Sequence, residues 1–167
     1  LLFKKNWIRV GVAAILIVLL SWEVWNYLNY YFKVYPKKDA IEWQYGIKDS
    51  ALYVLEHPEY SLVYVDKIRQ QPYIFFLYYL KVPLPTLLKT VKYNQTESKS
   101  YNTVSSFGRF NFGNWDPIES YPSSSILYIV TPSYYSGLRY ILKFDVKKLI
   151  KYPNGTDAFY LVSGNEY

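Results

Sequence analysis

The stretch that decides the class of this protein lies near the start of the chain and reads KKNWIRVGVAAILIVLLSWEVWNYLNYYFK, from Lys4 to Lys33. Its middle, Val10–Trp22, is uncharged and consists mostly of Val, Ile, Leu and Ala. A helix needs about 20 residues to cross the hydrocarbon core of a bilayer, and the run from Trp7 to Tyr27 has about that length. The stretch therefore predicts a transmembrane helix, which with its flanks forms a first domain over residues 1–33.

Aromatic residues flank the apolar run on both sides. Trp7 precedes it, and five aromatic residues follow its centre: Trp22, Trp25, Tyr27, Tyr30 and Tyr31. Belts of this kind mark the two membrane–water interfaces of an anchor. A cleavable signal peptide is the competing interpretation, and the absence of a small-residue cleavage site after the run argues against it. Glu23 is then expected to lie at the interface or to face a partner helix.

The charges around the run predict its orientation. The N-terminal flank contains only basic residues, namely Lys4, Lys5 and Arg9, whereas the other flank mixes lysines with Asp39 and Glu42. Basic residues are retained in the cytoplasm. We therefore expect a cell-membrane protein with a cytoplasmic N-terminus, an extracytoplasmic main domain, and membrane lipid and other transmembrane helices as partners.

The composition excludes several functions. The chain of 167 residues has no cysteine, so disulfides, thiolate metal sites and cysteine nucleophiles are excluded. Its net charge of +6 comes from scattered lysines rather than from a basic stripe, and no nucleic-acid partner is expected. Its 21 tyrosines suit surfaces that are half wet. The absence of methionine predicts that the chain was processed or cut from a longer one.

The first part of the second domain has the alternation of an α/β layer. Asp39 and Glu42 have the spacing of a capping box, so a helix is expected to start there and to end at His57. The β-branched run Ser61–Asp66 predicts a buried strand. Pro72–Leu80 predicts a helix that is too short to span a bilayer and, being apolar all round, is expected to be buried on every side.

The rest of the chain predicts mainly strands. We expect the following segments: a short helix at Thr86–Val91, a strand with turns at Phe107–Trp115, a core strand at Ser125–Thr131, and a hairpin within Leu138–Gly164 around Asn154-Gly155. The fold class predicted is therefore α/β: one N-terminal transmembrane helix, then a small extracytoplasmic α/β domain over residues 34–167 with a C-terminal β-hairpin.

One connection of this domain is a candidate binding site. Asp66 ends a predicted strand and opens the loop before a helix, which is the usual ligand side of an open α/β sheet. Lys67, Arg69 and Gln71 lie in the same loop and could contact a sugar or a phosphate. A plain strand-to-helix turn is the simpler interpretation. His57, the only histidine, is expected to be structural, and we assign no catalytic residue and no metal ligand.

Two N-glycosylation sequons occur, at Asn94-Gln95-Thr96 and at Asn154-Gly155-Thr156. Both asparagines are expected on exposed turns outside the membrane. Asn154 is also explained by the hairpin turn, so Asn94 is the better candidate for glycosylation.

The order of the segments resembles a known family. WQYGIKDSALYVLEH, VYVD, QQPYIFFLYYLKVPLP, FGRFNFGNWD, SILYIVTP and IKYPNGTDAFYLV follow one another as at the C-terminal end of membrane glycosyltransferases related to dolichyl-phosphate-mannose–protein mannosyltransferases. The motif W-x-x-G-x-K at Trp43–Lys48 and the run at Gln71–Tyr79 provide most of the likeness, which covers nearly the whole chain. After that run this sequence has VPLPTLL where the family often has Asp-Pro and a tyrosine.

The resemblance implies an enzyme that transfers a sugar from a polyprenyl-phosphate carrier to an acceptor, with a carboxylate as general base and, as is often the case in such enzymes, a divalent metal in the parent enzyme. In such enzymes the catalytic acid lies in an early loop that this chain lacks. The resemblance therefore implies a terminal anchor and outer domain that contributes to substrate binding rather than catalysis, and no cofactor in this chain. The alternative is a single-pass cell-surface protein whose tyrosine-rich domain binds a partner or assembles into a surface structure.

Overall fold

The computed structural model describes residues 2–66, 71–94, 103–113 and 122–165, and the side chains from residue 6 onward. The chain divides into two compact units, residues 1–40 and residues 41–167. The sequence analysis placed its domain boundary at residues 33 and 34, within the helical end of the first unit.

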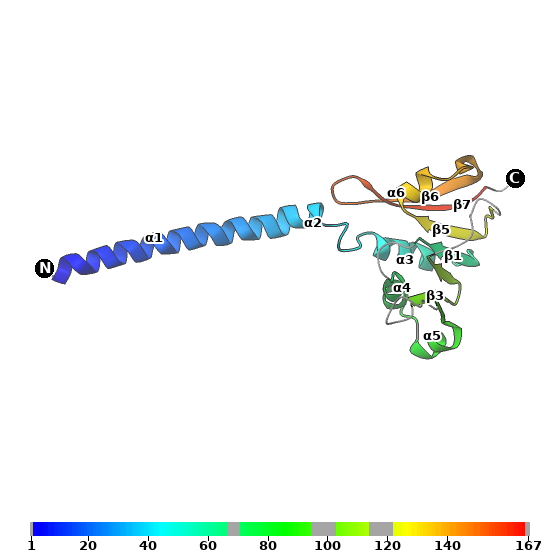
Figure 1. The fold of residues 1–167 in the computed structure, drawn as a ribbon, viewed down its shortest axis with the longest axis horizontal. Coiled ribbons are helices and arrows are strands. Elements are labelled where there is room, and N and C mark those ends of the chain that lie inside the picture. The colour runs from blue at the N-terminus through cyan, green and yellow to red at the C-terminus, as the bar shows by residue number, and fades with distance from the viewer. Residues whose placement is uncertain (1, 67–70, 95–102, 114–121, 166–167) are drawn as a thin grey trace. The chain divides into compact units, whose positions relative to one another are not determined.

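The first unit is one unbroken helical rod (Figure 1). It consists of the α-helix α1 (Leu2–Asn29), a π-helical turn (Tyr30–Val34) and the short α-helix α2 (Tyr35–Lys38). The helix over Asn6–Lys38 has a mean hydropathy of 1.9 in its most apolar window, none of which is buried. By length and composition it can cross a membrane.

The π-helical turn has a cause in the sequence. Pro36 has no backbone N–H, and in a regular α-helix its ring would collide with the carbonyl of Phe32. Immediately before it, the N–H of Tyr35 donates to the carbonyl of Tyr30, five residues back instead of four. The wider turn thus lets the rod continue through the proline without a break.

Over its described residues, the second unit is built on one mixed sheet of seven strands with the order β2-β3-β4-β1-β5-β7-β6. The strands are β1 (Leu62–Val65), β2 (Lys92–Asn94), β3 (Thr103–Phe107), β4 (Phe110–Phe112), β5 (Ile126–Val130), β6 (Phe144–Lys151) and β7 (Asp157–Gly164). The central strand β1 runs parallel to β4 and β5, and the other pairs are antiparallel.

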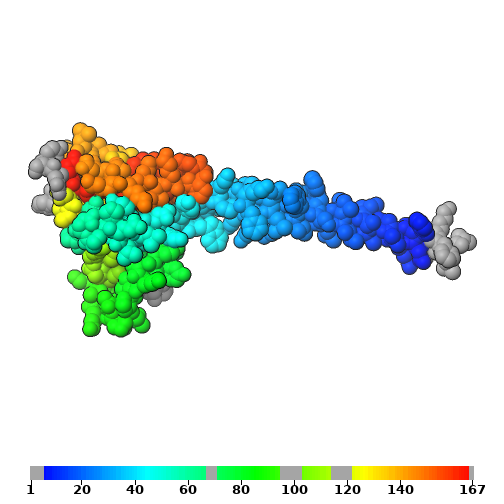
Figure 2. Space-filling model, turned by 180° about the vertical axis from the view of Figure 1, so that it is seen from behind, coloured from blue at the N-terminus to red at the C-terminus, as the bar shows by residue number. Residues whose placement is uncertain are grey.

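In the described part of this unit, four helices and a 3-10 turn accompany the sheet. They are α3 (Ile47–Glu56), α4 (Tyr73–Tyr79), α5 (Leu84–Thr90), α6 (Pro132–Ser136) and the 3-10 turn Ile141–Lys143. In Figure 2 the teal surface of α3 lies between the orange surface of the β6–β7 hairpin and the green surface of α4 and α5.

Apolar side chains fill both faces of the sheet. One face packs against α3 and α4, where Val63, Leu127 and Phe76 are fully buried. The other face holds a smaller, tyrosine-rich core around Tyr128, Val130 and Val162. Burial on both sides explains why β1 and β5 are nearly continuous apolar runs.

Several predicted elements are confirmed. The expected strands at Ser61–Asp66 and Ser125–Thr131 are β1 and β5, and the short helix expected at Thr86–Val91 is α5. β6 and β7 form the expected hairpin, although residues 152–156, rather than two turn residues, connect them. The segment from Phe107 gives the end of β3, a turn and β4, and its last two residues lie outside the described part.

The predicted start of α3 is wrong. The helix begins at Ile47, after Gly46 with a φ of 94°, and not at the expected capping box. Asp39 instead ends α2, where its N–H donates to the carbonyl of Tyr35. The positive φ angles of Gln44 and Gly46 interrupt the helix, because residues in this region cannot continue a right-handed turn.

The prediction that α4 is buried on every side is also wrong. Phe76 is completely buried, but Ile74 is 50% exposed and Tyr78 is 75% exposed. The helix therefore covers the core with one face and leaves an apolar face open. Uniform composition concealed this sidedness, because apolar residues on both faces give no periodic signal.

A charged side chain joins α3 to the sheet. Arg109, in the turn between β3 and β4, donates to three backbone carbonyls: Val54 at 2.9 Å, Tyr60 at 2.6 Å and Pro58 at 3.2 Å. The first of these lies in the last turn of α3, where carbonyls have no partner within the helix. Arg109 thus fixes the end of α3 and the chain that leads into β1.

Candidate functional site

The candidate site lies where the parallel strands β1 and β5 end. Asp66 follows β1 and Thr131 follows β5, and the parallel register of the two strands brings these residues to the same edge of the sheet. The N–H of Asp66 donates to the carbonyl of Ile129 at 2.9 Å, which continues the ladder past the end of β1. In open α/β sheets this edge is where ligands bind.

The carboxylate of Asp66 is held in a fixed orientation. Its Oδ2 accepts the Thr131 hydroxyl at 2.7 Å and the Thr131 N–H at 3.4 Å. The Thr131 hydroxyl oxygen in turn accepts the N–H of Tyr134 at 3.4 Å and lies 3.2 Å from the Ser133 hydroxyl. Both bonds to the carboxylate use Oδ2, and no described residue donates to Oδ1, so Oδ1 can accept from a further donor.

The other predicted site residues are placed less closely. Lys67 and Arg69 lie outside the described residues. Gln71 has a φ of 60°, and its carbonyl accepts the N–H of Ile74 at 3.4 Å, so its backbone shapes the start of α4. Asp66 therefore makes its hydrogen bonds with β5 and the residue that follows it, whereas Gln71 makes its hydrogen bond with α4.

The sequence analysis missed Thr131 and Ser133. Both lie in IVTPSYYS, where a threonine directly before a proline is a signal for the start of a helix. Thr131 does cap α6, accepting from Tyr134. Its bond to Asp66 could not be found from the sequence, because the neighbour relation of β1 and β5 depends on the strand order.

The tyrosines of the smaller, tyrosine-rich core stay protonated well above neutral pH. Tyr128 stacks on Tyr64, with ring centroids 5.4 Å apart, and burial raises the pKa of Tyr128 to about 12. Tyr160 donates its hydroxyl to Asp157, and this hydrogen bond raises the pKa of Tyr160. These neutral hydroxyls act as hydrogen-bonding groups and not as bases.

The remaining predicted residues have clear local environments. His57 donates its Nδ1–H to the carbonyl of Tyr53 at 2.8 Å and stacks on the Tyr53 ring at 3.8 Å. Asn94 is the exposed last residue of β2 rather than part of a turn, and its side-chain amide donates to Thr103. Asn154 lies exposed in the β6–β7 turn, where its Oδ1 accepts from the hydroxyl and the N–H of Thr156. Use of either sequon stays a prediction.

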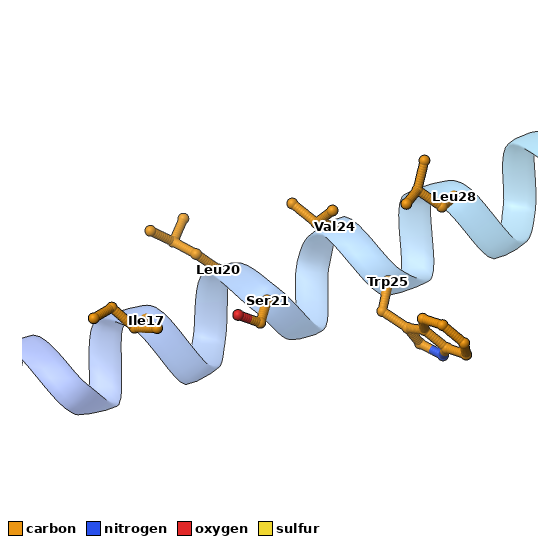
Figure 3. Close-up of a pocket in the computed structure, with 6 residues that line it drawn as sticks. All are labelled: Ile17, Leu20, Ser21, Val24, Trp25 and Leu28. Carbon is orange, nitrogen blue, oxygen red and sulfur yellow. The ribbon is translucent and has the colours of Figure 1, made fainter.

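A hollow of about 370 Å³ on α1 offers no comparable chemistry. Its lining residues all come from one helix: Ile17, Leu20, Ser21, Val24, Trp25 and Leu28. Figure 3 shows Trp25 pointing away from Leu20 and Val24, with no second element drawn against the helix. Such a surface suits lipid chains or a neighbouring helix.

Metal binding and known relatives give no further assignment. The described residues contain no group of three or more His, Asp and Glu side chains placed to share a metal ion. Comparison with protein-family models, with curated proteins and with solved structures found no match to this chain.

Proposed function

We propose that the chain is the terminal anchor and outer domain of a membrane glycosyltransferase that uses a polyprenyl-phosphate sugar. In this proposal the outer domain contributes to substrate binding, and a catalytic loop and any divalent metal belong to the rest of the parent enzyme. The observation that supports it is the oriented carboxylate of Asp66 at the shared end of β1 and β5. The resemblance of the segment order and the membrane-compatible helix agree with it.

The chemistry of the edge fits a sugar better than an anion. A carboxylate that is fixed through one oxygen accepts hydrogen bonds from hydroxyl groups through the other. The Ser133 hydroxyl adds a group that both donates and accepts, whereas the single hydroxyl proton of Thr131 is already donated to Asp66. Lys67 and Arg69, in the following loop, would supply positive charge for the phosphate of a lipid-linked sugar.

A binding experiment tests the strand-edge site, by which we mean Asp66, Thr131 and Ser133 at the ends of β1 and β5. The second unit is compact and has its own core, so we expect residues 41–167 to fold on their own. We expect citronellyl-phosphate mannose to shift the amide resonances of Asp66 and Thr131 saturably, and Asp66→Asn to weaken binding about tenfold or more. Asp145→Asn, which removes an exposed carboxylate paired with Lys147, is the control and should leave binding unchanged. Equal binding by both variants would contradict the assignment.

A second experiment tests the parent enzyme. The intact mass of the native polypeptide from membranes, with peptide mapping upstream of Leu1, shows whether the chain is part of a longer polypeptide. A multi-pass chain with an acidic early loop supports the proposal. A native chain of about the present length would overturn it.

A second candidate is favoured by the exposed apolar faces of α4 and α5. Ile74, Tyr78, Leu84 and Leu88 are between 50% and 75% exposed. In a cell-surface protein such a face would bind a partner or another copy. This candidate predicts that residues 41–167 self-associate in sedimentation experiments and that Tyr78→Asp abolishes the association. A strictly monomeric domain would count against assembly into a surface structure.

A further inference from the structure

The motif W-x-x-G-x-K, which the strand-edge site leaves unexplained, lines a second hollow. Residues 43–49, where the chain turns into α3, face Phe75 and Tyr79 of α4 across a space of about 360 Å³. This volume lies at the lower end of the range of about 300–1,000 Å³ that small-molecule sites occupy. All of these residues belong to the second unit.

The lining combines aromatic rings with polar groups that can both donate and accept. Trp43 is 68% exposed and Tyr45 is 41% exposed, so both present ring surface to solvent, although the Tyr45 ring also packs against Tyr152. Lys48 and Asp49 are the second and third residues of α3, and they supply an ammonium donor and a carboxylate acceptor. Rings that pack against C–H groups, beside donors and acceptors for hydroxyls, match the surface of a hexopyranose.

Gln44 provides an independent observation. Its side-chain oxygen Oε1 is buried and has no hydrogen-bond partner among the described residues. A buried acceptor without a donor costs free energy, and native proteins rarely leave one without a reason. Oε1 is closed to solvent in this conformation, so we expect the Gln44 side chain to turn toward the hollow on binding, where a hydroxyl group of the ligand supplies the missing donor.

The backbone of Gln44 is strained as well. Its φ is 53°, in the left-handed region that side chains other than glycine rarely adopt. Gly46, two residues later, has a φ of 94° and no room for a Cβ, because the side chains of Phe159 and Ile150 pack against it. This packing holds the loop in its conformation. Strain and an orphaned acceptor on one residue are features that concentrate at binding sites.

We propose that this hollow is a sugar-binding subsite that takes one hexopyranose unit, with Trp43 and Tyr79 against the ring and Gln44, Lys48 and Asp49 to its hydroxyls. The proposal does not rest on the strand-edge site or on the glycosyltransferase function. The same pyranose chemistry could come from a free glycan or from a lipid-linked sugar.

The test uses residues 41–167 and nuclear magnetic resonance. Methyl α-mannopyranoside, methyl α-glucopyranoside and N-acetylglucosamine are the free probes, and citronellyl-phosphate mannose is the lipid-linked probe. We expect at least one probe to shift the Trp43 indole and Gln44 side-chain amide signals saturably. A response to the free glycosides assigns a glycan site, and a response to the lipid-linked probe alone assigns a carrier-linked sugar. No saturable shift with any probe overturns the proposal.

The decisive variant is Gln44→Gly. It removes the amide and relieves the positive φ, so we expect a loss of binding of tenfold or more with an unchanged or raised urea midpoint, which misfolding would not produce. Trp43→Phe should keep part of the affinity that Trp43→Ala loses. Asp66→Asn should leave binding at the hollow intact, so failure here and failure of the strand-edge site are distinguishable. Full binding by Gln44→Gly would overturn the role of Gln44.

Discussion

Gly46 shows how one residue fixes the geometry around it. Its φ of 94° ends the loop before α3, and a Cβ built on it would lie 2.9 Å from Cδ2 of Phe159 and 3.0 Å from Cγ2 of Ile150. Both of those side chains are buried. The glycine is therefore required twice, for its backbone angle and for the close approach of β6 and β7 beneath it.

These two requirements can be separated by mutation. We expect Gly46→Ala to lower the free energy of unfolding by roughly 2–5 kcal/mol, because backbone strain adds to the displacement of core side chains. Gly155→Ala is the matched control, since Gly155 has a φ of 89° with nothing near its Cβ position. It should cost only the backbone term of about 1–2 kcal/mol. Urea unfolding of residues 41–167 measures both, and equal losses would show that the core contact adds nothing.

The buried tyrosines predict a loss of stability at high pH. Burial raises the pKa values of Tyr53 and Tyr128 to about 12 from an ordinary value of 10. Above pH 10 the unfolded chain therefore loses protons that the folded protein retains, which favours unfolding. The stability is fully present below pH 10 and is lost between pH 10 and about 12, by up to about 1.4 kcal/mol per pH unit for Tyr128.

The urea midpoint measured across this pH range checks the prediction. Tyr128→Phe removes one titrating group, so its stability should fall less steeply above pH 10 even if its stability at neutral pH differs. An identical slope in the variant would show that Tyr128 ionises equally in both states.

At the scale of elements, α4 shows that two apolar residues of one helix can differ widely in how deeply they are buried. Phe76 packs against Phe110 and Phe112 with ring centroids 5.3 Å and 5.7 Å away, whereas Ile74 on the same helix is half exposed. We expect Phe76→Ala to cost about 3–5 kcal/mol and Ile74→Ala to change stability by no more than about 0.5 kcal/mol. Chemical denaturation of the two variants checks this. A comparable loss of stability in both would support the sequence-based prediction that α4 is buried on every side.

The sequence predicted those elements whose signal is local. β1 and β5 were found because β-branched runs bounded by polar residues indicate buried strands, and the β6–β7 hairpin was found from Asn154-Gly155. The start of α3 was missed because Asp39 and Glu42 satisfy a spacing rule that the backbone of Gln44 and Gly46 overrides. Likewise, Asp66 was found from its place at a strand end, but its partner Thr131 and the hollow beside Trp43 depend on tertiary packing.

At the scale of the whole molecule, the orientation in the membrane can be measured directly. The chain has no cysteine, so single introduced cysteines report on their own side of the membrane. If the basic N-terminal flank lies in the cytoplasm, a membrane-impermeant maleimide should label Lys147→Cys in intact cells and Asn6→Cys only after permeabilisation. Both positions are exposed in the structure. The reverse pattern would place the second unit in the cytoplasm and exclude use of the two sequons.

The place of β7 in the sheet sets the order of events during synthesis. β7 is the last strand of the sheet along the described chain, yet it lies between β5 and β6, and its Phe159 packs against Gly46, near the start of the unit. Until residue 164 has been made, the side of β5 that pairs with β7 has no neighbouring strand, and such unpaired strand edges attract other chains. The sheet is therefore complete only once β7 has been made, and we expect a chain released before that point to expose the unpaired side of β5 to other chains.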